Sequence, residues 1–438
     1  MAQDIDRFYQ LCDPAQPLKP GDQRYVPCDD VRGDGDLVGQ LARALRRSET
    51  PLHLLLTGHR GAGKSTELLR LEHRLSNPQD EANRFFVVYF EADKEDVDVN
   101  DVDFPDLLLA VIRQVGKALR ERLGEELLPA RLRRFWEDVK NLLGSEVNVE
   151  EVEFDAKIAK FTGTIRDSPN EREVIRKALE PKVSGLIDAA NDLLDEAMIR
   201  LRARGYRGLV LIVDNLDRII LRQLNEEFNT HEQLFINRGL QLIALRCHVV
   251  YTLPISMVFS PRATALSRIF SRNPSTLPMV RVITRQGEDD EAGLEAMREM
   301  VRKRLHEAGA TQDEAFDTND TLDYLCRMSG GHARSLFQLL RSACDRLDDF
   351  PLTHAVVEQA VREVSNSFER ALDNPEFYDD LRQIDEAHDL VGITHKQVLL
   401  YNFSVLEYLN AEPWYAVNPT VRLLKKFKAP CGKLQRSR

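Results

Sequence analysis

Short apolar runs alternate with longer segments whose apolar residues recur at helical spacing, up to about residue 285. Five runs stand out, and they span residues 52–57, 84–90, 209–214, 248–253 and 277–284. Runs of this length without polar alternation are typical of parallel strands that are buried on both faces of a sheet. Amphipathic stretches lie between them, for example at residues 36–47, 66–75 and 104–119. The pattern predicts an α/β fold in which helices flank a parallel sheet.

Residues 120–205 interrupt this alternation with a long and mostly helical stretch, whose clearest apolar stripe covers residues 180–204. A stripe of this kind is far more often core packing than a partner interface. Within the stretch, residues 147–165 alternate apolar and charged side chains. Both a small hairpin and a loosely ordered insertion fit that alternation, so the structure of residues 145–168 stays open.

The composition is that of a globular protein, with 43% hydrophobic and 30% charged residues among 438. No apolar run approaches the roughly 18 to 20 residues of a transmembrane helix, and the N-terminus lacks the pattern of a signal peptide. These features predict a cytoplasmic protein. The six cysteines form no Cys-x-x-Cys pair, which argues against a zinc site or a disulfide framework.

Charge is distributed unevenly along the chain. The formal net charge of −11 argues against attraction of the whole surface to nucleic acid. Residues 91–106 carry eight acids and one lysine, whereas residues 420–438 carry seven Lys and Arg residues and no acid. Runs of one sign are usually solvated faces or tails, and we expect the same here.

The segment after the first apolar run has the phosphate-loop pattern of a glycine, four free positions and then Gly-Lys-Ser. It reads Gly58-His59-Arg60-Gly61-Ala62-Gly63-Lys64-Ser65, and Thr66 follows at the start of a helical stretch. Glycines let backbone N–H groups wrap phosphates, and the N-terminus of a helix favours negative charge. We therefore expect Lys64 to reach the β- and γ-phosphates of ATP and the Ser65 hydroxyl to bind Mg²⁺.

The third apolar run ends in an acid, Asp214, and continues with Asn215, Leu216 and Asp217. In phosphate-loop NTPases, a carboxylate at the tip of a strand beside the loop holds Mg²⁺ through water. Asp214 is therefore expected to be the second metal-binding residue. Together the two motifs predict an enzyme that binds ATP and Mg²⁺ and releases ADP and phosphate.

Three further residues are candidates for contacts with the nucleotide. Tyr25 and Val26 lie just before the predicted α/β fold, where the adenine pocket is often built, although plain packing explains them equally well. Thr252, near the tip of the fourth run, is a candidate sensor of the γ-phosphate. A structural role at the end of a strand is its alternative.

Arginines from a short helical stretch at residues 261–272 are candidates for an arginine finger that completes a neighbouring subunit's site. They are Arg262, Arg268 and Arg272. Solvated helix arginines are the alternative.

Beyond these motifs, the chain resembles the AAA+ and STAND families of phosphate-loop ATPases, close to the origin-recognition branch. The resemblance is carried by Met328-Ser329-Gly330-Gly331-His332-Ala333-Arg334-Ser335-Leu336, which is similar to the lid segment of those families. It implies that Arg334 is a sensor-2 arginine that contacts the γ-phosphate. Residues 353–372 resemble the closing lid helix. Residues 373–428 resemble a winged helix, with a helix at 376–388, strands at 405–409 and 414–417, and a wing turn at 410–413.

The resemblance implies a P-loop NTPase sheet followed by a helical lid and a C-terminal winged-helix domain. The division is a segment of irregular structure at 1–35, the ATPase domain at 36–285 with its helical insertion at about 120–205, the lid at 286–372, the winged helix at 373–428 and a basic tail at 429–438.

Two positions depart from the family pattern. AAA+ proteins usually place a glutamate directly after the Walker B aspartate, but this chain has Asn215, and an amide cannot accept a proton. The resemblance to STAND proteins then makes Asp217 the expected base. STAND winged helices often present a histidine before a proline to the β-phosphate, where this chain has Asn418 before Pro419. Both departures indicate slow turnover and a switch.

The leading hypothesis is an ATP-dependent molecular switch whose lid and winged helix reorient to control a homo-oligomer or a separately encoded effector protein, in a setting such as bacterial signalling or phage defence. An alternative is a DNA-binding initiator or transposition regulator that uses the winged helix and the basic tail. Its phosphate-neutralising residues would be Arg422, Lys425, Lys426, Lys428, Lys433, Arg436 and Arg438. A third possibility is a nucleotide-gated scaffold that does not hydrolyse ATP.

Overall fold

The structure is a computed structural model, and it describes residues 5–33, 35–95, 97–124, 134–135, 137, 139 and 167–429. Most of the segment at 145–168 and all but the first residue of the predicted tail at 429–438 lie outside the described residues. The chain divides into two compact units. We call residues 38–57 and 68–275 the sheet unit, and residues 1–37, 58–67 and 276–438 the lid unit.

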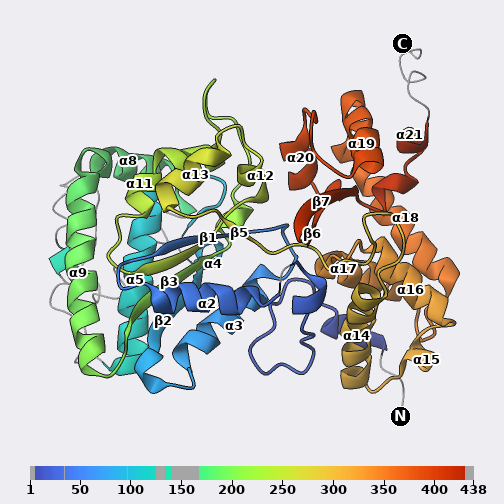
Figure 1. Cartoon of the computed structure of the whole chain (residues 1–438), viewed down its shortest axis with the longest axis horizontal. Coiled ribbons are helices and arrows are strands. Elements are labelled where there is room, and N and C mark those ends of the chain that lie inside the picture. Colours follow the sequence, from blue (N-terminus) through green and yellow to red (C-terminus); the bar gives the residue numbers. More distant parts are fainter. Residues whose placement is uncertain are drawn as a thin grey trace. The chain divides into compact units, whose positions relative to one another are not determined.

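The sheet belongs to the sheet unit except for the end of its last strand, and it has the order β2-β3-β4-β1-β5 (Figure 1). Its first four strands in sequence are β1 (His53–Thr57), β2 (Phe85–Glu91), β3 (Gly208–Asp214) and β4 (His248–Thr252). Each pair among them is parallel, with Leu55 opposite Tyr251 and Glu91 opposite Asp214. The α/β prediction and four of the five predicted strands are confirmed.

Apolar side chains of the strands pack against helices, because every residue of β1, β3 and β4 is buried. The longest helices that the structure describes in this unit are α5 (Phe104–Leu123) and α9 (Val183–Ala203), and both contribute to one continuous core. Other helical elements that lie wholly or partly in this unit are α2 (Leu37–Arg47), α3 (Lys64–Ser76), η2 (Glu81–Asn83), α4 (Ala92–Glu95), α8 (Pro169–Leu179), η5 (Glu180–Lys182), η6 (Leu216–Arg218), α10 (Thr230–Glu232), η7 (Gln233–Asn237), α11 (Gly239–Leu242), α12 (Ile255–Val258) and α13 (Ala263–Phe270).

The fifth predicted strand, at residues 277–284, is wrong. The strand β5 is only Ser275–Thr276. The residues that follow are mostly apolar and belong to the lid unit. Two of their backbone N–H groups bond other parts of that unit: Met279 donates to the Glu407 carbonyl at 3.0 Å and Val280 to the Gly331 carbonyl at 3.2 Å. Other elements of the lid unit bury this apolar run. It therefore has the sequence pattern of a buried strand, although it does not pair with the sheet.

Helices form the larger part of the lid unit and enclose a core of their own. They are α14 (Glu291–Ala308), α15 (Gln312–Ala315), α16 (Asn319–Met328), α17 (Ala333–Cys344) and α18 (His354–Ala371). Residues predicted to be irregular form a helix, α1 (Ile5–Leu11), which contacts α14 and α17, and a short turn, η1 (Asp29–Val31). The lid core includes Ile5 and Phe8 of α1.

The C-terminal part of the lid unit has the predicted winged-helix elements. A helix, α19 (Pro375–Ala387), precedes an antiparallel hairpin of β6 (Val405–Asn410) and β7 (Glu412–Val417), in which Tyr408 stacks on Trp414. A further helix, α20 (Lys396–Tyr401), lies between α19 and β6, and the sequence pattern had not indicated it. Two short elements follow, η8 (Val421–Leu423) and α21 (Lys425–Lys428).

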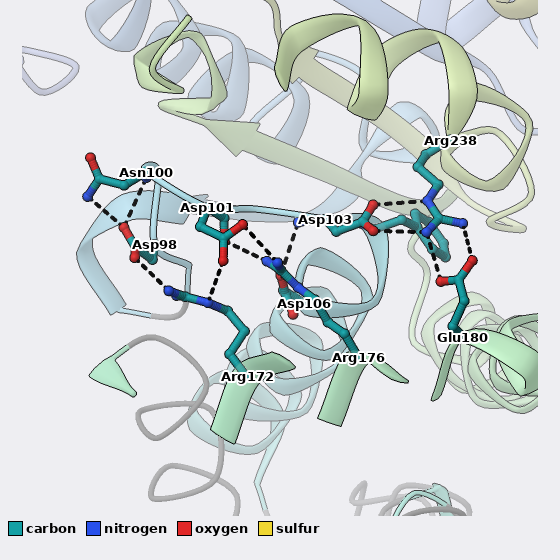
Figure 2. Close-up of polar contacts among 10 residues, drawn as sticks. Asp98, Asn100, Asp101, Asp103, Asp106, Arg172, Arg176, Glu180 and Arg238 are labelled. Carbon is teal, nitrogen blue, oxygen red and sulfur yellow. Dashed lines mark hydrogen bonds and ion pairs between the residues drawn. The ribbon is translucent and has the colours of Figure 1, made fainter. Parts of the chain in front are cut away.

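The acidic run after β2 is an ionic network within the sheet unit, and the expectation of a solvated face is wrong there. Figure 2 shows three arginines from other elements that point at its carboxylates. Arg172 bonds Asp98 and Asp101, Arg176 bonds Asp101 and Asp106, and Arg238 makes a bidentate contact with Asp103 at 3.0 and 2.9 Å and also bonds Glu180. Arg172 is only 2% exposed. The network fixes the loop between β2 and α5.

Candidate nucleotide site

The phosphate-loop residues Gly58 to Thr66 follow β1 directly and lead into α3. Gly58, Gly61 and Gly63 have φ values of 138°, 90° and 108°, a region in which only glycine is unstrained. The buried Lys64 folds back over this loop, and its Nζ donates to the carbonyls of Gly58 at 2.7 Å and His59 at 2.9 Å. Because an ammonium group can exchange these carbonyls for phosphate oxygens, the loop fits a nucleotide phosphate chain.

Contacts from the lid and the winged helix hold the same loop within the lid unit. His332, at the start of α17, donates through Nε2 to the Arg60 carbonyl at 2.8 Å. A Cβ added at Gly61 would lie 2.6 Å from the Cβ of Arg334, so Arg334 packs directly on this glycine. The backbone N–H of Glu407 in β6 donates to Nε2 of His59 at 3.1 Å. Both histidine rings also contact the ring of Phe403. We call the contacts of His59, Phe403 and Glu407 the winged-helix contact.

Both histidines are neutral in this arrangement. Burial and the nearby Lys64 lower the pKa of His59 to about 3, and burial and the charge of Arg334 contribute to a pKa of His332 well below its ordinary value. His59 accepts the Glu407 N–H at Nε2, so its own proton is on Nδ1. The winged-helix contact therefore needs no positive charge beside the loop.

Glu407 is the titratable group that makes the stability of this contact depend on pH. Its side chain is 7% exposed, and burial raises the pKa of its carboxyl to about 7 from an ordinary 4.5. The facing groups are neutral His59 and the opposite Tyr415, whose own pKa burial raises. The folded protein thus favours the protonated carboxyl. Its stabilising effect is full below pH 4.5 and is lost as pH rises through 7.

We therefore expect the effect of Glu407→Gln on the free energy of unfolding to be about 3 kcal/mol more favourable at pH 8 than at pH 4.5. This is the free energy that corresponds to the difference between the carboxyl pKa values of the folded and unfolded protein. Urea denaturation of the wild type and the variant at both pH values measures this difference. Tyr415→Phe is a control, since it leaves the carboxyl in place. An equal effect of Glu407→Gln at both pH values would show that the carboxyl is not buried as described.

A second group of polar residues gathers at the carboxyl ends of β2 and β3 in the sheet unit. Asp214 accepts a hydrogen bond from the Tyr89 hydroxyl at 2.8 Å and one from the N–H of Asn215 at 2.7 Å. Asn215 has a left-handed backbone, with φ of 66°, and its Nδ2 donates to Glu91 at 3.1 Å and to Asp93 at 2.6 Å. Arg218 pairs with the second oxygen of Asp93 at 2.7 Å.

The strand order decides the type of fold. The strand that leads into the phosphate loop is separated from the strand that ends in Asp214 by one strand, β4, and all three are parallel. The carboxyl ends of parallel strands share one edge, where nucleotides bind in open α/β sheets. This is a P-loop NTPase fold. The remaining helices and the hairpin supply the lid and the winged helix that the sequence predicts.

Thr252 is the last residue of β4, and Asp217 lies in the turn after β3. The Thr252 hydroxyl is fully buried and accepts from the N–H of Leu216 at 2.9 Å, so it joins the end of β4 to the turn after β3. Asp217, in η6, is 5% exposed. Sequence reasoning missed His231, which bonds Ser256 at 2.9 Å and the Ile219 carbonyl at 2.7 Å and holds the same turn. Burial lowers the pKa of His231 to about 4.

The other predicted residues are distributed over both units. In the lid unit, Thr66 accepts from the N–H of Leu18 at 3.1 Å, Tyr25 donates to Glu67 at 3.3 Å, and Val26 packs against the lid core. The Asn418 carboxamide is used within its own turn: its nitrogen donates to the Phe403 carbonyl and its oxygen accepts from Thr420.

The arginine-finger candidates differ in their surroundings. In the sheet unit, Arg262 pairs with Glu232 at 3.7 Å and lies over the ring of Phe228. Arg268 and Arg272 are exposed and have no ion-pair partner among the described residues. Of the three candidates, Arg262 alone therefore has an ion pair among the described residues.

A cavity of about 360 Å³ lies in the lid unit beside the phosphate loop. It is lined by Arg60 and Arg334, by residues of α17 and α18, and by Phe403 and Asn418 of the winged helix. No acidic residue lines it among the described residues. Its charge therefore favours an anionic group next to the loop.

No protein-family model and no curated protein sequence matches the chain. Solved structures that are similar to it include ORC and Cdc6 proteins. The Aeropyrum pernix ORC2 protein, in ADPNP-ADP complexes, is 13% identical, with a TM-score of 0.43 and 96% of each chain covered. A structure of Drosophila ORC bound to DNA is 12% identical, with a TM-score of 0.41, covering 94% of this chain and 88% of that one. Cdc6p from Pyrobaculum aerophilum is 11% identical, with a TM-score of 0.38 and 96% of each chain covered. Similarity at this level concerns the course of the chain and not the residues of the site.

Within the part of the chain that the structure describes, no helix is both long and apolar enough to cross a membrane.

Proposed function

We propose that the protein is an ATP-dependent molecular switch that hydrolyses ATP slowly. The observation that carries this proposal is that the winged helix and the lid bond directly to the phosphate loop, through Glu407 to His59 and through His332 to Arg60. The residues that would bind phosphates are thus the residues that hold the two C-terminal elements. A nucleotide in the loop cannot leave those contacts unchanged.

In the proposed site, Lys64 binds the β- and γ-phosphates, and backbone N–H groups from Gly61 to Thr66 bind the phosphate oxygens. Ser65 and Asp214 hold Mg²⁺, which neutralises phosphate charge and orients the phosphates when it is bound. Arg334 senses the γ-phosphate, since it already packs against Gly61. Tyr25 and Val26 remain the proposed neighbours of the adenine.

The switch is a shift between two populations. In the arrangement described here, Lys64 bonds carbonyls of its own loop and His59 bonds β6. Phosphates recruit Lys64 and Arg334 and change the backbone around His59, which weakens the winged-helix contact. By linkage, the winged-helix contact lowers the affinity for ATP by the same factor by which bound ATP weakens the contact.

The proposed partner is a second copy of this chain or a separately encoded effector protein, in a role such as bacterial signalling or phage defence. Arg268 and Arg272 would reach a neighbouring subunit's site in an oligomer. The charges of the winged helix do not favour duplex DNA, since Arg422 pairs with Asp385 and Arg382 pairs with Asp379.

Three measurements on the purified protein test the proposal: ATP and ADP affinity, phosphate release over a range of protein concentrations, and duplex binding over a range of salt concentrations. A switch binds ATP with Mg²⁺, releases phosphate slowly, and does so faster per subunit at high concentration if it oligomerises. Failure to bind ATP would overturn the proposal. Binding without release would leave a nucleotide-gated scaffold, and salt-dependent duplex binding would favour the DNA-binding alternative.

A further inference from the structure

We propose that Glu91, at the end of β2, is the general base for ATP hydrolysis, in the role that the missing acid at position 215 would have. This inference rests on the proposed function, because it assigns a residue to that reaction. The proposal replaces the expectation from the sequence that Asp217 is the base.

The register of the sheet places Glu91 beside the metal-binding candidate. Glu91 is the last residue of β2 and lies directly opposite Asp214, the last residue of β3. Side chains two residues apart on a strand share one face, so Glu91 lies on the same face as Tyr89. The Tyr89 hydroxyl bonds Asp214, which places the side chains of β2 and β3 together on this face.

Asn215 holds the Glu91 carboxylate from the position where an acid is missing. Its backbone N–H bonds one oxygen of Asp214, which fixes the residue in its left-handed conformation. Its side-chain amide then donates to Oε2 of Glu91 at 3.1 Å. Positions 91 and 215 thus form an acid–amide pair in which β2 supplies the acid.

Glu91 has an oxygen available for a proton. Its Oε2 bonds both Asn215 and Lys94, the latter at 2.7 Å, whereas its Oε1 accepts no hydrogen bond from any described residue. The Glu91 side chain is 15% exposed, so water reaches it. Asp93 differs, because Asn215 occupies one of its oxygens and Arg218 the other. Of the two acids that Asn215 contacts, only Glu91 can take a proton without losing a partner.

The chain after Glu91 is anchored at both ends, which limits the movement of the carboxylate. Close to it, Asp93 is tied to Asn215 and Arg218. Further along, the ionic network in Figure 2 fixes the loop to α8 through Arg172 and Arg176, and to the turn between η7 and α11 through Arg238. A base must be held within hydrogen-bond reach of the water, and this anchoring serves that requirement.

In the proposed step, Oε1 of Glu91 accepts a proton from a water molecule while the water oxygen forms a bond to the γ-phosphorus. The bond between that phosphorus and the oxygen bridging to the β-phosphate breaks, and its electron pair stays on ADP. The products are ADP and phosphate, and the proton on Glu91 passes to phosphate or to solvent. The step needs no other reactant.

The test compares Glu91→Gln with Asp217→Asn and with Glu171→Gln, a control at an exposed glutamate of α8. We measure the rate constant of single-turnover phosphate release and the ATP affinity of each protein. We expect Glu91→Gln to lower the rate at least 100-fold with ATP affinity within about threefold of wild type. Asp217→Asn should lower the rate constant less, and Glu171→Gln should not change it.

A reciprocal exchange makes the assignment stricter. Glu91→Asn alone should abolish phosphate release. Adding Asn215→Glu should then raise the rate constant at least tenfold, because the acid of the pair is now the residue directly after β3. Wild-type rates in Glu91→Gln would overturn the inference and leave the proposed function intact. ATP binding without turnover in wild type would overturn both this inference and hydrolysis, and no ATP binding at all would overturn the proposed function.

Discussion

Replacing Lys64 with alanine is expected to weaken ATP binding at least 100-fold and to abolish phosphate release. Lys64 is 5% exposed, and its ammonium group donates to the carbonyls of Gly58 and His59. Charge-assisted bonds to phosphate at such a buried position are worth about 1.5–3 kcal/mol each, and the γ-phosphate adds charge that only ATP brings. Isothermal titration calorimetry with ATP and ADP measures the loss.

The matched control is Lys19→Ala, which removes an exposed lysine of the lid unit and the same formal charge. It should leave both affinities unchanged. The melting temperature of Lys64→Ala without nucleotide shows whether the loop still folds, since its carbonyls lose their donor. Unchanged ATP affinity in a folded Lys64→Ala protein would contradict the assignment of the phosphate loop.

Replacing Gly331 with alanine is expected to destabilise the protein by more than about 3 kcal/mol, one of the large single-residue effects that overpacking and backbone strain produce. Gly331 has φ of 71°, and a Cβ there would lie 1.8 Å from the carbonyl oxygen of Val280. That carbonyl belongs to backbone, and the N–H of the same residue bonds the Gly331 carbonyl at 3.2 Å. The segment therefore cannot yield without breaking its own bond to the lid.

Gly309→Ala is the matched control, because it separates strain from overlap. Gly309 also lies in the lid unit and has φ of 84°, but nothing lies within 4 Å of the position of its Cβ. Gly309→Ala should lower the free energy of unfolding by only about 1–2 kcal/mol, which is the strain of an alanine in the left-handed region. Urea denaturation of both variants gives the difference. Equal losses would mean that the close approach of Val280 to the lid turn is absent.

Much of the fold could be predicted from the sequence because the relevant signals are local. The phosphate loop depends on glycines and a lysine at fixed spacing, and β1 to β4 are apolar runs that a parallel sheet buries on both faces. The hairpin of β6 and β7 was predicted for the same reason, since its strands flank a tight turn at Ala411.

The errors and omissions concern which element a residue meets, and this is not local. An apolar run indicates that a segment is buried but not which element buries it. Residues 277–284 therefore had the pattern of a strand, although the lid and the winged helix cover them. The acidic run looked solvated because its arginine partners lie about 70 residues away or more. The contact of Asn215 with Glu91 depends on sheet register across more than 100 residues. The sequence feature that could have pointed to Glu91 is its position directly after the apolar run at 84–90.

The most direct test of the switch is amide hydrogen exchange of β6, followed in the wild type without nucleotide and with saturating ATP and Mg²⁺. Because the Glu407 N–H is bonded to His59 of the phosphate loop, its exchange reports the winged-helix contact. Helix α14 serves as the internal reference. We predict that ATP accelerates exchange at Glu407 at least tenfold and leaves α14 unchanged. Unchanged exchange at Glu407 in protein with ATP bound would contradict a switch in which the nucleotide releases the winged helix.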